Sequence, residues 1–99
     1  MLTYVYENTA IIAGGTWSGT TLFISGGLCR QVYVKATTAS TTYNATMIDE
    51  GNRTIRSWSG NEQLINDLTA FPVYGKYTFN ITNSNANEPF DILLHFVLN

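Results

Sequence analysis

The sequence predicts an all-β protein, a single antiparallel β-sandwich of about seven or eight short strands with jelly-roll or immunoglobulin-like topology. Composition is the first observation that predicts this fold. The chain contains 14 Thr, 10 Asn and 6 Ser together with 6 Tyr and 5 Phe, a mixture that favours strands joined by polar turns over helices. The second observation is the alternation of apolar and polar side chains with a period of two along several segments. A chain of 99 residues accommodates one such domain, residues 1–99.

The N-terminal part of the chain is expected to contribute three strands. Residues 2–6 are apolar on one face and rich in aromatic residues, and they are predicted to form an edge strand. Residues 20–24 form the next predicted strand, after which the glycine pair 26–27 is predicted to turn the chain. Alternation through residues 28–36 indicates the third strand. One face of that strand carries Leu28, Arg30, Val32, Val34 and Ala36, and the other carries Cys29, Gln31, Tyr33 and Lys35.

The middle of the chain predicts a hairpin. Residues 43–47 alternate as a strand, the polar residues 49–52 have the composition of a turn, and residues 53–58 form the returning strand. Residues 62–68 contain leucine and isoleucine at a spacing of three and four, but they span about two helical turns at most. We therefore expect a crossover loop there.

The C-terminal part predicts two long strands. Residues 73–81 place apolar residues or glycine at every odd position, which puts Tyr77 and Phe79 in the core. Residues 90–98 have one wholly apolar face and one mixed face, so this strand is expected to be nearly buried on both sides. The Asn-rich segment 83–87 between them has turn composition, and we expect the two strands to form a long hairpin.

Charge and targeting signals exclude several classes of protein. The formal net charge is -2 and the five Lys and Arg are scattered, which argues against a nucleic-acid partner. No stretch approaches the ~20 apolar residues of a transmembrane helix, and Glu7 interrupts the run that a signal peptide needs. A single cysteine, Cys29, cannot form an internal disulfide. We expect synthesis in a reducing cytosol and no membrane association.

The residues able to carry out chemistry are few and dispersed. His95 lies four residues from Asp91 in one predicted strand, about 13 Å away, too far for a hydrogen bond. Cys29 has no base beside it in sequence. The turn at 49–52 has oxygen ligands near a glycine but lacks the spacing of a calcium loop. We expect no catalytic residues, no metal site and no cofactor, and hence no enzyme.

Contact with other chains is the predicted mode of action, because Trp, Tyr and Arg dominate binding hot spots. Each aromatic residue has an alternative role in the core, which for Trp58 is the stronger interpretation. An exposed aromatic edge strand invites another chain to pair with it. The residues predicted to contact a neighbouring subunit are Leu2, Tyr4, Tyr6, Trp17, Arg56 and Trp58.

Three segments together resemble small β-sandwich structural proteins of tailed bacteriophage virions. They are residues 26–34 (GGLCRQVYV), the turn 49–52 (DEGN) and residues 68–79 (LTAFPVYGKYTF). The resemblance implies a capsid decoration, or cement, protein that is made in the host cytoplasm and sits on the virion surface. It also implies that the major capsid protein or other virion proteins are the partners, and that the chain forms a homo-oligomer, often a trimer in such families.

Two other functions fit the same sequence. A carbohydrate-binding or adhesin-like module would present Trp17, Trp58 and Tyr74 on one surface. A small tail or fibre protein would differ from a decoration protein only in its location on the particle. Placing the three aromatic residues on one sheet face would favour the sugar-binding alternative.

Overall fold

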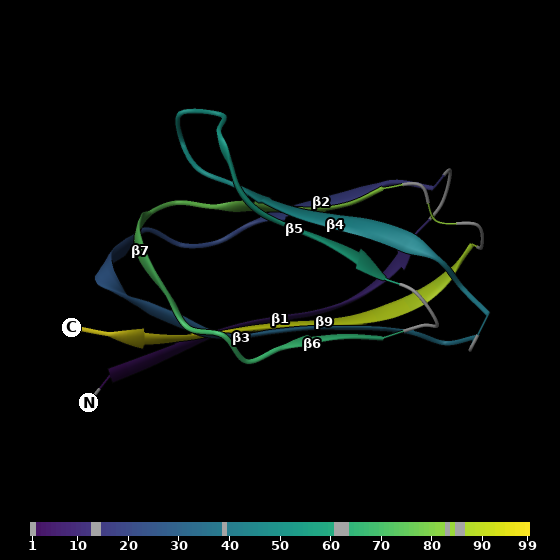
Figure 1. Ribbon diagram of the computed structural model, residues 1–99, viewed down its shortest axis with the longest axis horizontal. Helices are drawn as coiled ribbons and strands as arrows, with labels where there is room; N and C mark the ends of the chain where they lie inside the picture. Colours follow the sequence, from purple (N-terminus) through teal and green to yellow (C-terminus); the bar gives the residue numbers. More distant parts are fainter. Residues whose placement is uncertain (1, 13–14, 39, 61–63, 83, 85–86) are drawn as a thin grey trace.

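The computed structural model describes residues 2–12, 15–38, 40–60, 64–82, 84 and 87–99. These residues form nine strands in two antiparallel sheets packed face to face (Figure 1), which confirms the predicted β-sandwich. The strands are β1 (Leu2–Ile12), β2 (Trp17–Thr20), β3 (Ile24–Ala36), β4 (Tyr43–Ile48), β5 (Thr54–Gly60), β6 (Leu64–Asp67), β7 (Phe71–Gly75), β8 (Thr78–Thr82) and β9 (Glu88–Leu98).

The two sheets contain five and four strands. In the five-stranded sheet the order is β1-β9-β3-β6, and β7 pairs with β3 on the same side as β6. In the four-stranded sheet the order is β2-β8-β4-β5. Edge strand β1, predicted from residues 2–6, is confirmed and extends to Ile12. In the described ranges, no helix is long and apolar enough to span a membrane.

The pairing is that of one long hairpin wound into a sandwich. The β4–β5 turn is its tip, and outward from it β3 pairs with β6 and β7, β2 with β8, and β1 with β9. Two arms that alternate between two sheets in this way make a jelly roll, one of the two predicted topologies.

The core is built from the inward positions of both sheets. On β9 the residues Phe90, Ile92, Leu94 and Phe96 are at most 1% exposed. The other face of β9 is not covered by any described element: Pro89 and Asp91 are exposed, and Leu93, His95 and Val97 are half-buried. The expectation that this strand is nearly buried on both sides was therefore wrong.

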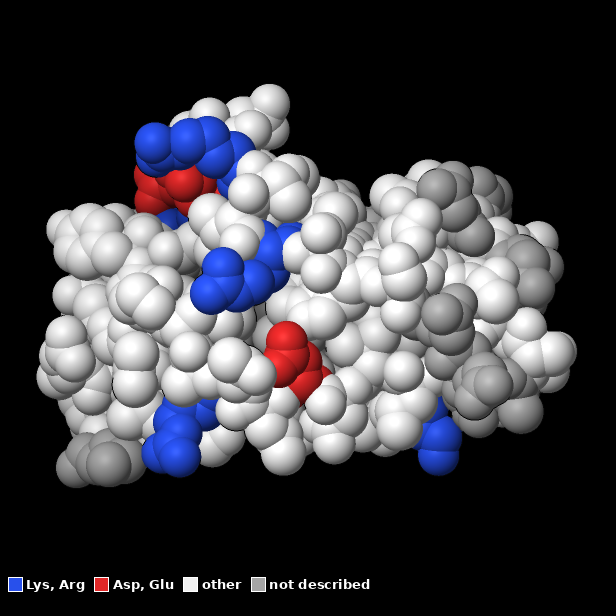
Figure 2. All heavy atoms as spheres, in the orientation of Figure 1, with Lys and Arg blue, Asp and Glu red and all other residues white. Residues whose placement is uncertain are grey.

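Charged side chains are sparse over the side of the molecule in view (Figure 2).

The segment 73–81 is not one strand, and it does not form a hairpin with residues 90–98. The chain leaves the five-stranded sheet at Gly75, which has φ 101°, and enters the four-stranded sheet at Thr78. Its odd positions stay buried throughout, and Tyr77 and Phe79 are core residues as predicted. Because both sheets face one core, the period of two continues across the break.

Three further predictions were wrong at the level of elements. Residues 20–24 are not a strand, since β2 ends at Thr20 and β3 begins at Ile24. The glycine pair 26–27 lies inside β3, at positive φ and at a shift of register against β7. Residues 64–67 form strand β6 where a crossover loop was expected, and residues 62–63 lie outside the described residues.

A bulge in β3 changes which side chains face the core. The register against β9 shifts between Cys29 and Gln31, so that Arg30 is the extra residue. As a result Cys29 and Val32 both face inward and are buried, whereas Leu28 is 41% exposed. The predicted faces of residues 28–36 are therefore correct only after the bulge.

Candidate functional site

Three of the six predicted contact residues lie on β1. The ring of Tyr4 stacks on Phe96 with 5.6 Å between ring centroids, and its hydroxyl accepts a 3.2 Å hydrogen bond from the backbone N–H of Leu22. Leu2, at the start of the strand, is 67% exposed. The structure thus fixes β1 to the fold through Tyr4 and leaves its first side chain open to solvent.

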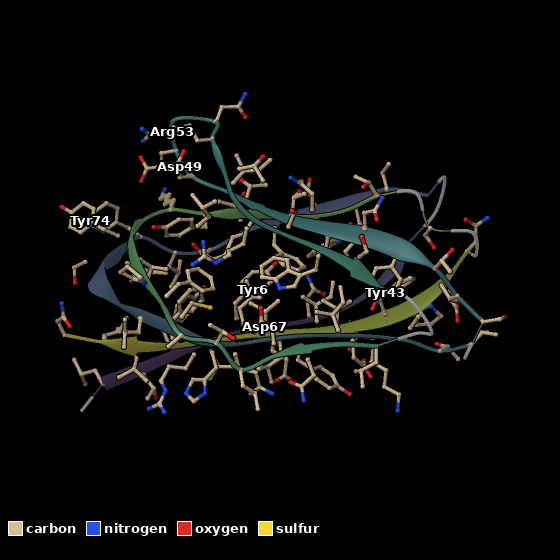
Figure 3. All side chains as sticks on the ribbon, in the orientation of Figure 1. Tyr6, Tyr43, Asp49, Arg53, Asp67 and Tyr74 are labelled. Atoms are coloured by element: carbon tan, nitrogen blue, oxygen red, sulfur yellow. The ribbon has the colours of Figure 1, made fainter. Side chains whose placement is uncertain are left out.

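Tyr6 and Trp17 close the side of the sandwich between β1 and β2. Both are half-buried and pack against the core, and Figure 3 shows Tyr6 between the two sheets. Gly19 makes room for them, since a Cβ there would lie 2.0 Å from the Tyr6 hydroxyl oxygen and 2.7 Å from the Trp17 ring. Such distances are far below van der Waals contact, so glycine is required at this position.

Trp58 and Arg56 close the opposite side, where β5 lies beside β6 and β7. The indole Nε1 of Trp58 donates a 2.8 Å hydrogen bond to Asp67, and its ring lies 5.9 Å from that of Phe79. The Arg56 guanidinium carbon lies 4.6 Å from the centre of the Phe71 ring, a cation–π contact. The Trp58 hydrogen bond is the main reason that the pKa of Asp67 lies below its usual value.

The two tryptophans occupy one row across the four-stranded sheet but at its opposite edges. Trp17 pairs with Ile81, Ile81 with Ala45, and Ala45 with Trp58. Both indoles pack inward on the core, whereas Tyr74 is 69% exposed on β7. The structure does not bring these three aromatic residues onto one surface. The six contact residues remain a prediction.

The outer faces of the two sheets differ in chemistry. The outward positions of the four-stranded sheet carry no charge among the described residues: Ser18, Thr20, Asn44, Thr46, Ile48, Thr54, Ser57, Ser59, Thr78, Asn80 and Thr82. The outer face of the five-stranded sheet combines apolar residues with charge. Along its rows Val5 pairs with His95, Glu7 with Leu93, and Asp91 with Lys35.

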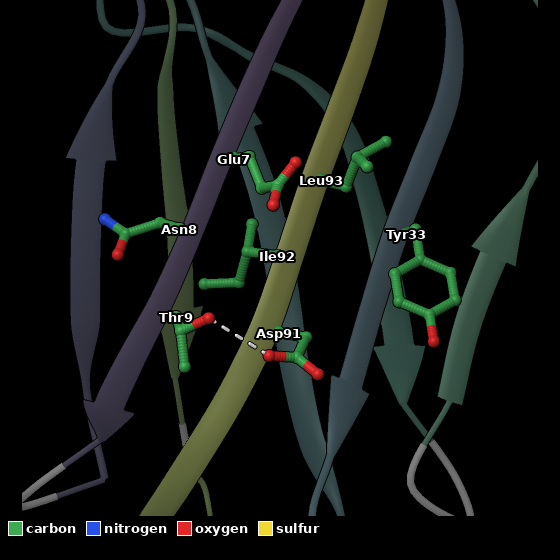
Figure 4. Close-up of a pocket in the computed structure, with 7 residues that line it drawn as sticks. All are labelled: Glu7, Asn8, Thr9, Tyr33, Asp91, Ile92 and Leu93. Carbon is green, nitrogen blue, oxygen red and sulfur yellow. Dashed lines mark hydrogen bonds between the residues drawn. The ribbon is translucent and has the colours of Figure 1, made fainter.

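A hollow of about 300 Å³ lies on this second face, across β1, β9 and β3 (Figure 4). Leu93 lies between the carboxylate of Glu7 and the ring of Tyr33. Asp91 accepts a 3.1 Å hydrogen bond from the Thr9 hydroxyl. The hollow therefore contains two carboxylates and an aromatic ring beside the edge strand. Alternation alone does not predict this group of residues, because the sequence does not show that β1 pairs with β9.

Cys29 and His95 lie on opposite faces of the five-stranded sheet. The Cys29 thiol is buried in the core, and this burial raises its pKa to about 12, so the nucleophilic thiolate is scarce at neutral pH. His95 is half-buried on the outer face. The sheet separates the two side chains, and they cannot act as a nucleophile and its base.

The turn at 49–52 is held by its first residue. Asp49 Oδ1 accepts hydrogen bonds of 2.9 and 3.0 Å from the N–H groups of Gly51 and Arg53, and Oδ2 pairs with the Arg53 guanidinium at 3.0 Å. These contacts, led by the Arg53 backbone hydrogen bond, hold the pKa of Asp49 below its usual value. The carboxylate is thereby occupied in forming the turn.

Comparison with known proteins shows the fold and no family. No family model matches the chain, and no curated protein matches its sequence. Among solved structures, the chain is similar to the pre-peptidase C-terminal domain of a collagenase from Bacillus anthracis, with a TM-score of 0.55 and 16% identity over 96% of this chain and 87% of that one. At this level of identity the similarity concerns the β-sandwich alone.

Two viral structures show more distant similarity. One is that of infectious bursal disease virus strain Gt, with a TM-score of 0.43 and 10% identity over 97% of this chain and 32% of that one. The other is the enzymatically active domain of tailspike protein 4 of bacteriophage CBA120, with a TM-score of 0.33 and 11% identity over 96% of this chain and 18% of that one.

Proposed function

We propose that this protein is a non-enzymatic structural component of a virion, a capsid decoration protein that bridges neighbouring shell subunits. The observation that carries the proposal is edge strand β1. It is 11 residues long, and its pairing with β9 runs from Leu2 to Ile12 without a shift of register. A long regular edge with free backbone groups is a template for a strand of another chain.

The other sheet edges are short or interrupted, features that oppose such pairing, whereas β1 is long and regular. Strands β2 and β6 have four residues each. Strand β7 contains Pro72 and ends at Gly75, and β5 carries Arg56 and contains a register shift at Ile55. Short length, proline, charge and bulges are the usual protections of an exposed edge. On β1 the single charged residue is Glu7, so this edge is the one suited to pairing.

The mechanism of a decoration protein is burial rather than chemistry. A strand added to β1 would form backbone hydrogen bonds along the edge and cover Leu2 and Val5, which are 67% and 45% exposed. Each bound copy would add interface area between shell subunits and so resist the pressure of packaged nucleic acid. The burial of Cys29 in the core, and its separation by the sheet from His95 on the outer face, support a role without catalysis.

The proposal is tested by lysine substitutions on β1. Thr3→Lys with Val5→Lys places two charges on the exposed side of the edge strand, and we expect at least a tenfold loss of copies per purified particle, measured by quantitative mass spectrometry. The matched control is Ser18→Lys with Thr20→Lys on the short edge strand β2, which should be incorporated normally. Circular dichroism should show both variants folded.

The copy number of the unmodified chain decides its location. A fixed ratio to the major shell protein, near one to one or one trimer per capsomer, is expected for a decoration protein. A handful of copies per particle would assign the chain to the tail or fibre. Absence from particles, or normal incorporation of the β1 lysine variant, would overturn the proposal.

A further inference from the structure

Two aromatic rings stand exposed at the end of the sandwich that carries the β4–β5 turn. Phe23, from the β2–β3 connection, is 53% exposed, and Tyr74, on β7, is 69% exposed. Their centroids lie 5.4 Å apart at an interplanar angle of 80°. Leu22 beside Phe23 is also 69% exposed. Apolar side chains gathered on a surface in this way mark a binding site more often than isolated ones do.

The backbone under these rings is held in place. The Tyr77 hydroxyl accepts a 2.8 Å hydrogen bond from the N–H of Tyr74 and donates one of 3.0 Å to its carbonyl. Thr21, next to Leu22, donates its N–H to the Tyr77 carbonyl at 2.9 Å and accepts from the Tyr77 N–H at 3.1 Å through its hydroxyl. The rings are therefore mounted on a fixed support, and a ligand would not have to order them on binding.

Polar groups of both signs face the rings across a hollow of about 310 Å³. Glu50 is positioned by a 2.7 Å hydrogen bond from the N–H of Lys76 to its Oε1, and it lies so close to Gly75 that a Cβ there would be 2.9 Å from that oxygen. Arg53, paired with Asp49, supplies a guanidinium. Figure 3 shows Asp49, Arg53 and Tyr74 at the same end of the molecule.

We propose that this hollow binds a neutral saccharide. A sugar ring presents an apolar face that stacks on an aromatic ring and hydroxyls that donate to a carboxylate and accept from a guanidinium. Arg53 is paired with Asp49, and Oε1 of Glu50 accepts the N–H of Lys76. The donor and acceptor positions that these side chains still offer suit a neutral ligand rich in hydroxyl groups. The site contains Tyr74 of the predicted sugar-binding trio, with Phe23, Glu50 and Arg53 in place of the two tryptophans.

The test is a titration of the isolated, isotopically labelled protein with maltose, cellobiose, lactose and diacetylchitobiose, followed by amide chemical shifts. We expect at least one disaccharide to shift the amides of residues 22–23, 49–53 and 74–76 with millimolar affinity. Tyr74→Ala should weaken that binding about tenfold or more. Leu64→Ala, which removes a 47% exposed side chain from β6, is the matched control and should leave binding unchanged.

Three results would overturn the proposal: no shifts with any of the four sugars, shifts confined to another surface, or affinity unaffected by Tyr74→Ala. Tighter binding of an arginine-rich peptide at the same amides would also overturn it, because it would identify a cationic protein partner. None of the residues that line the hollow belongs to β1, so the site does not depend on the proposed virion role. The β1 lysine variant should therefore bind the sugar as the unmodified protein does.

Discussion

At the scale of single residues, Glu88 shows how a buried carboxylate holds a loop. It begins β9 and is 9% exposed, and it accepts a 2.7 Å hydrogen bond from the N–H of Thr38 and another from the Thr41 hydroxyl. Thr37 adds a 2.8 Å bond from its hydroxyl to the carbonyl of Pro89. The β3–β4 connection is thus fastened to β9 by polar contacts that no local pattern in the sequence reveals.

These hydrogen bonds make stability depend on pH. Led by the Thr41 bond, they hold the pKa of Glu88 below its ordinary 4.5 in the folded protein. A depressed folded pKa gives stabilisation that is complete above the unfolded value and is lost as pH falls through the folded value. Glu88→Gln should therefore lower the free energy of unfolding by about 1 kcal/mol at neutral pH. Between neutral and acidic pH, the free energy of unfolding should fall less in this variant than in the unmodified protein.

Urea denaturation at a series of pH values measures this difference. Asp67→Asn is the companion variant, because Asp67 also has a lowered pKa, but from hydrogen bonds with Trp58 and Thr69. Parallel stability–pH curves for Glu88→Gln and the unmodified protein would show that the Glu88 contacts do not contribute.

At the scale of elements, the sequence predicts a strand well where the alternation of apolar and polar residues runs unbroken along it. Strands β4, β5 and β9 and edge strand β1 were found near their predicted positions. The break between β7 and β8 was hidden because the residues on both sides of it face the same core. The bulge at Arg30 was hidden for a related reason: an added residue shifts the period only against a partner strand that the sequence does not identify.

The proposed saccharide site could likewise be predicted only in part from the alternation of residues. Tyr74 occupies an even position of an alternating segment whose odd positions are buried, so its exposure was readable from the sequence. The exposure of both Leu22 and Phe23 was not, because the sequence predicts a strand over residues 20–24 with Leu22 and Ile24 on the same face. Only the end of β2 at Thr20 places Leu22 and Phe23 outside both sheets.

Gly75 permits the transfer of the chain from one sheet to the other. Its φ of 101° is one that other residues rarely adopt, and a Cβ there would lie 2.9 Å from Glu50 Oε1. Gly75→Ala should therefore destabilise the fold by about 1–3 kcal/mol. Gly51→Ala is the matched control, since Gly51 has no such φ and its nearest neighbours are side-chain atoms at 3.2–3.3 Å. Equal midpoints for the two variants in urea would contradict this role of Gly75.

At the scale of the whole molecule, composition and alternation were enough to predict an antiparallel sandwich but not its winding. The two ends of the chain meet in β1 and β9, where Leu2 pairs with Leu98, and the adjacent strands β4 and β5 form a local hairpin. Nothing in a single strand specifies a partner so far along the chain. The jelly-roll order follows from the nesting of all the pairs around the β4–β5 turn.

This nesting predicts slow folding that begins at the turn. Pairs distant in sequence form only after a large loss of chain entropy, so we expect refolding in the millisecond-to-second range typical of all-β domains. Asp49→Ala removes the contacts that hold the β4–β5 turn and should mainly slow folding, whereas Tyr4→Ala loosens β1 from β9 and should mainly speed unfolding. Stopped-flow fluorescence of Trp17 and Trp58 in urea resolves both rates. Folding faster than a millisecond would contradict the predicted slow folding. An effect of Asp49→Ala on the unfolding rate alone would show that the turn forms after the outer strands have paired.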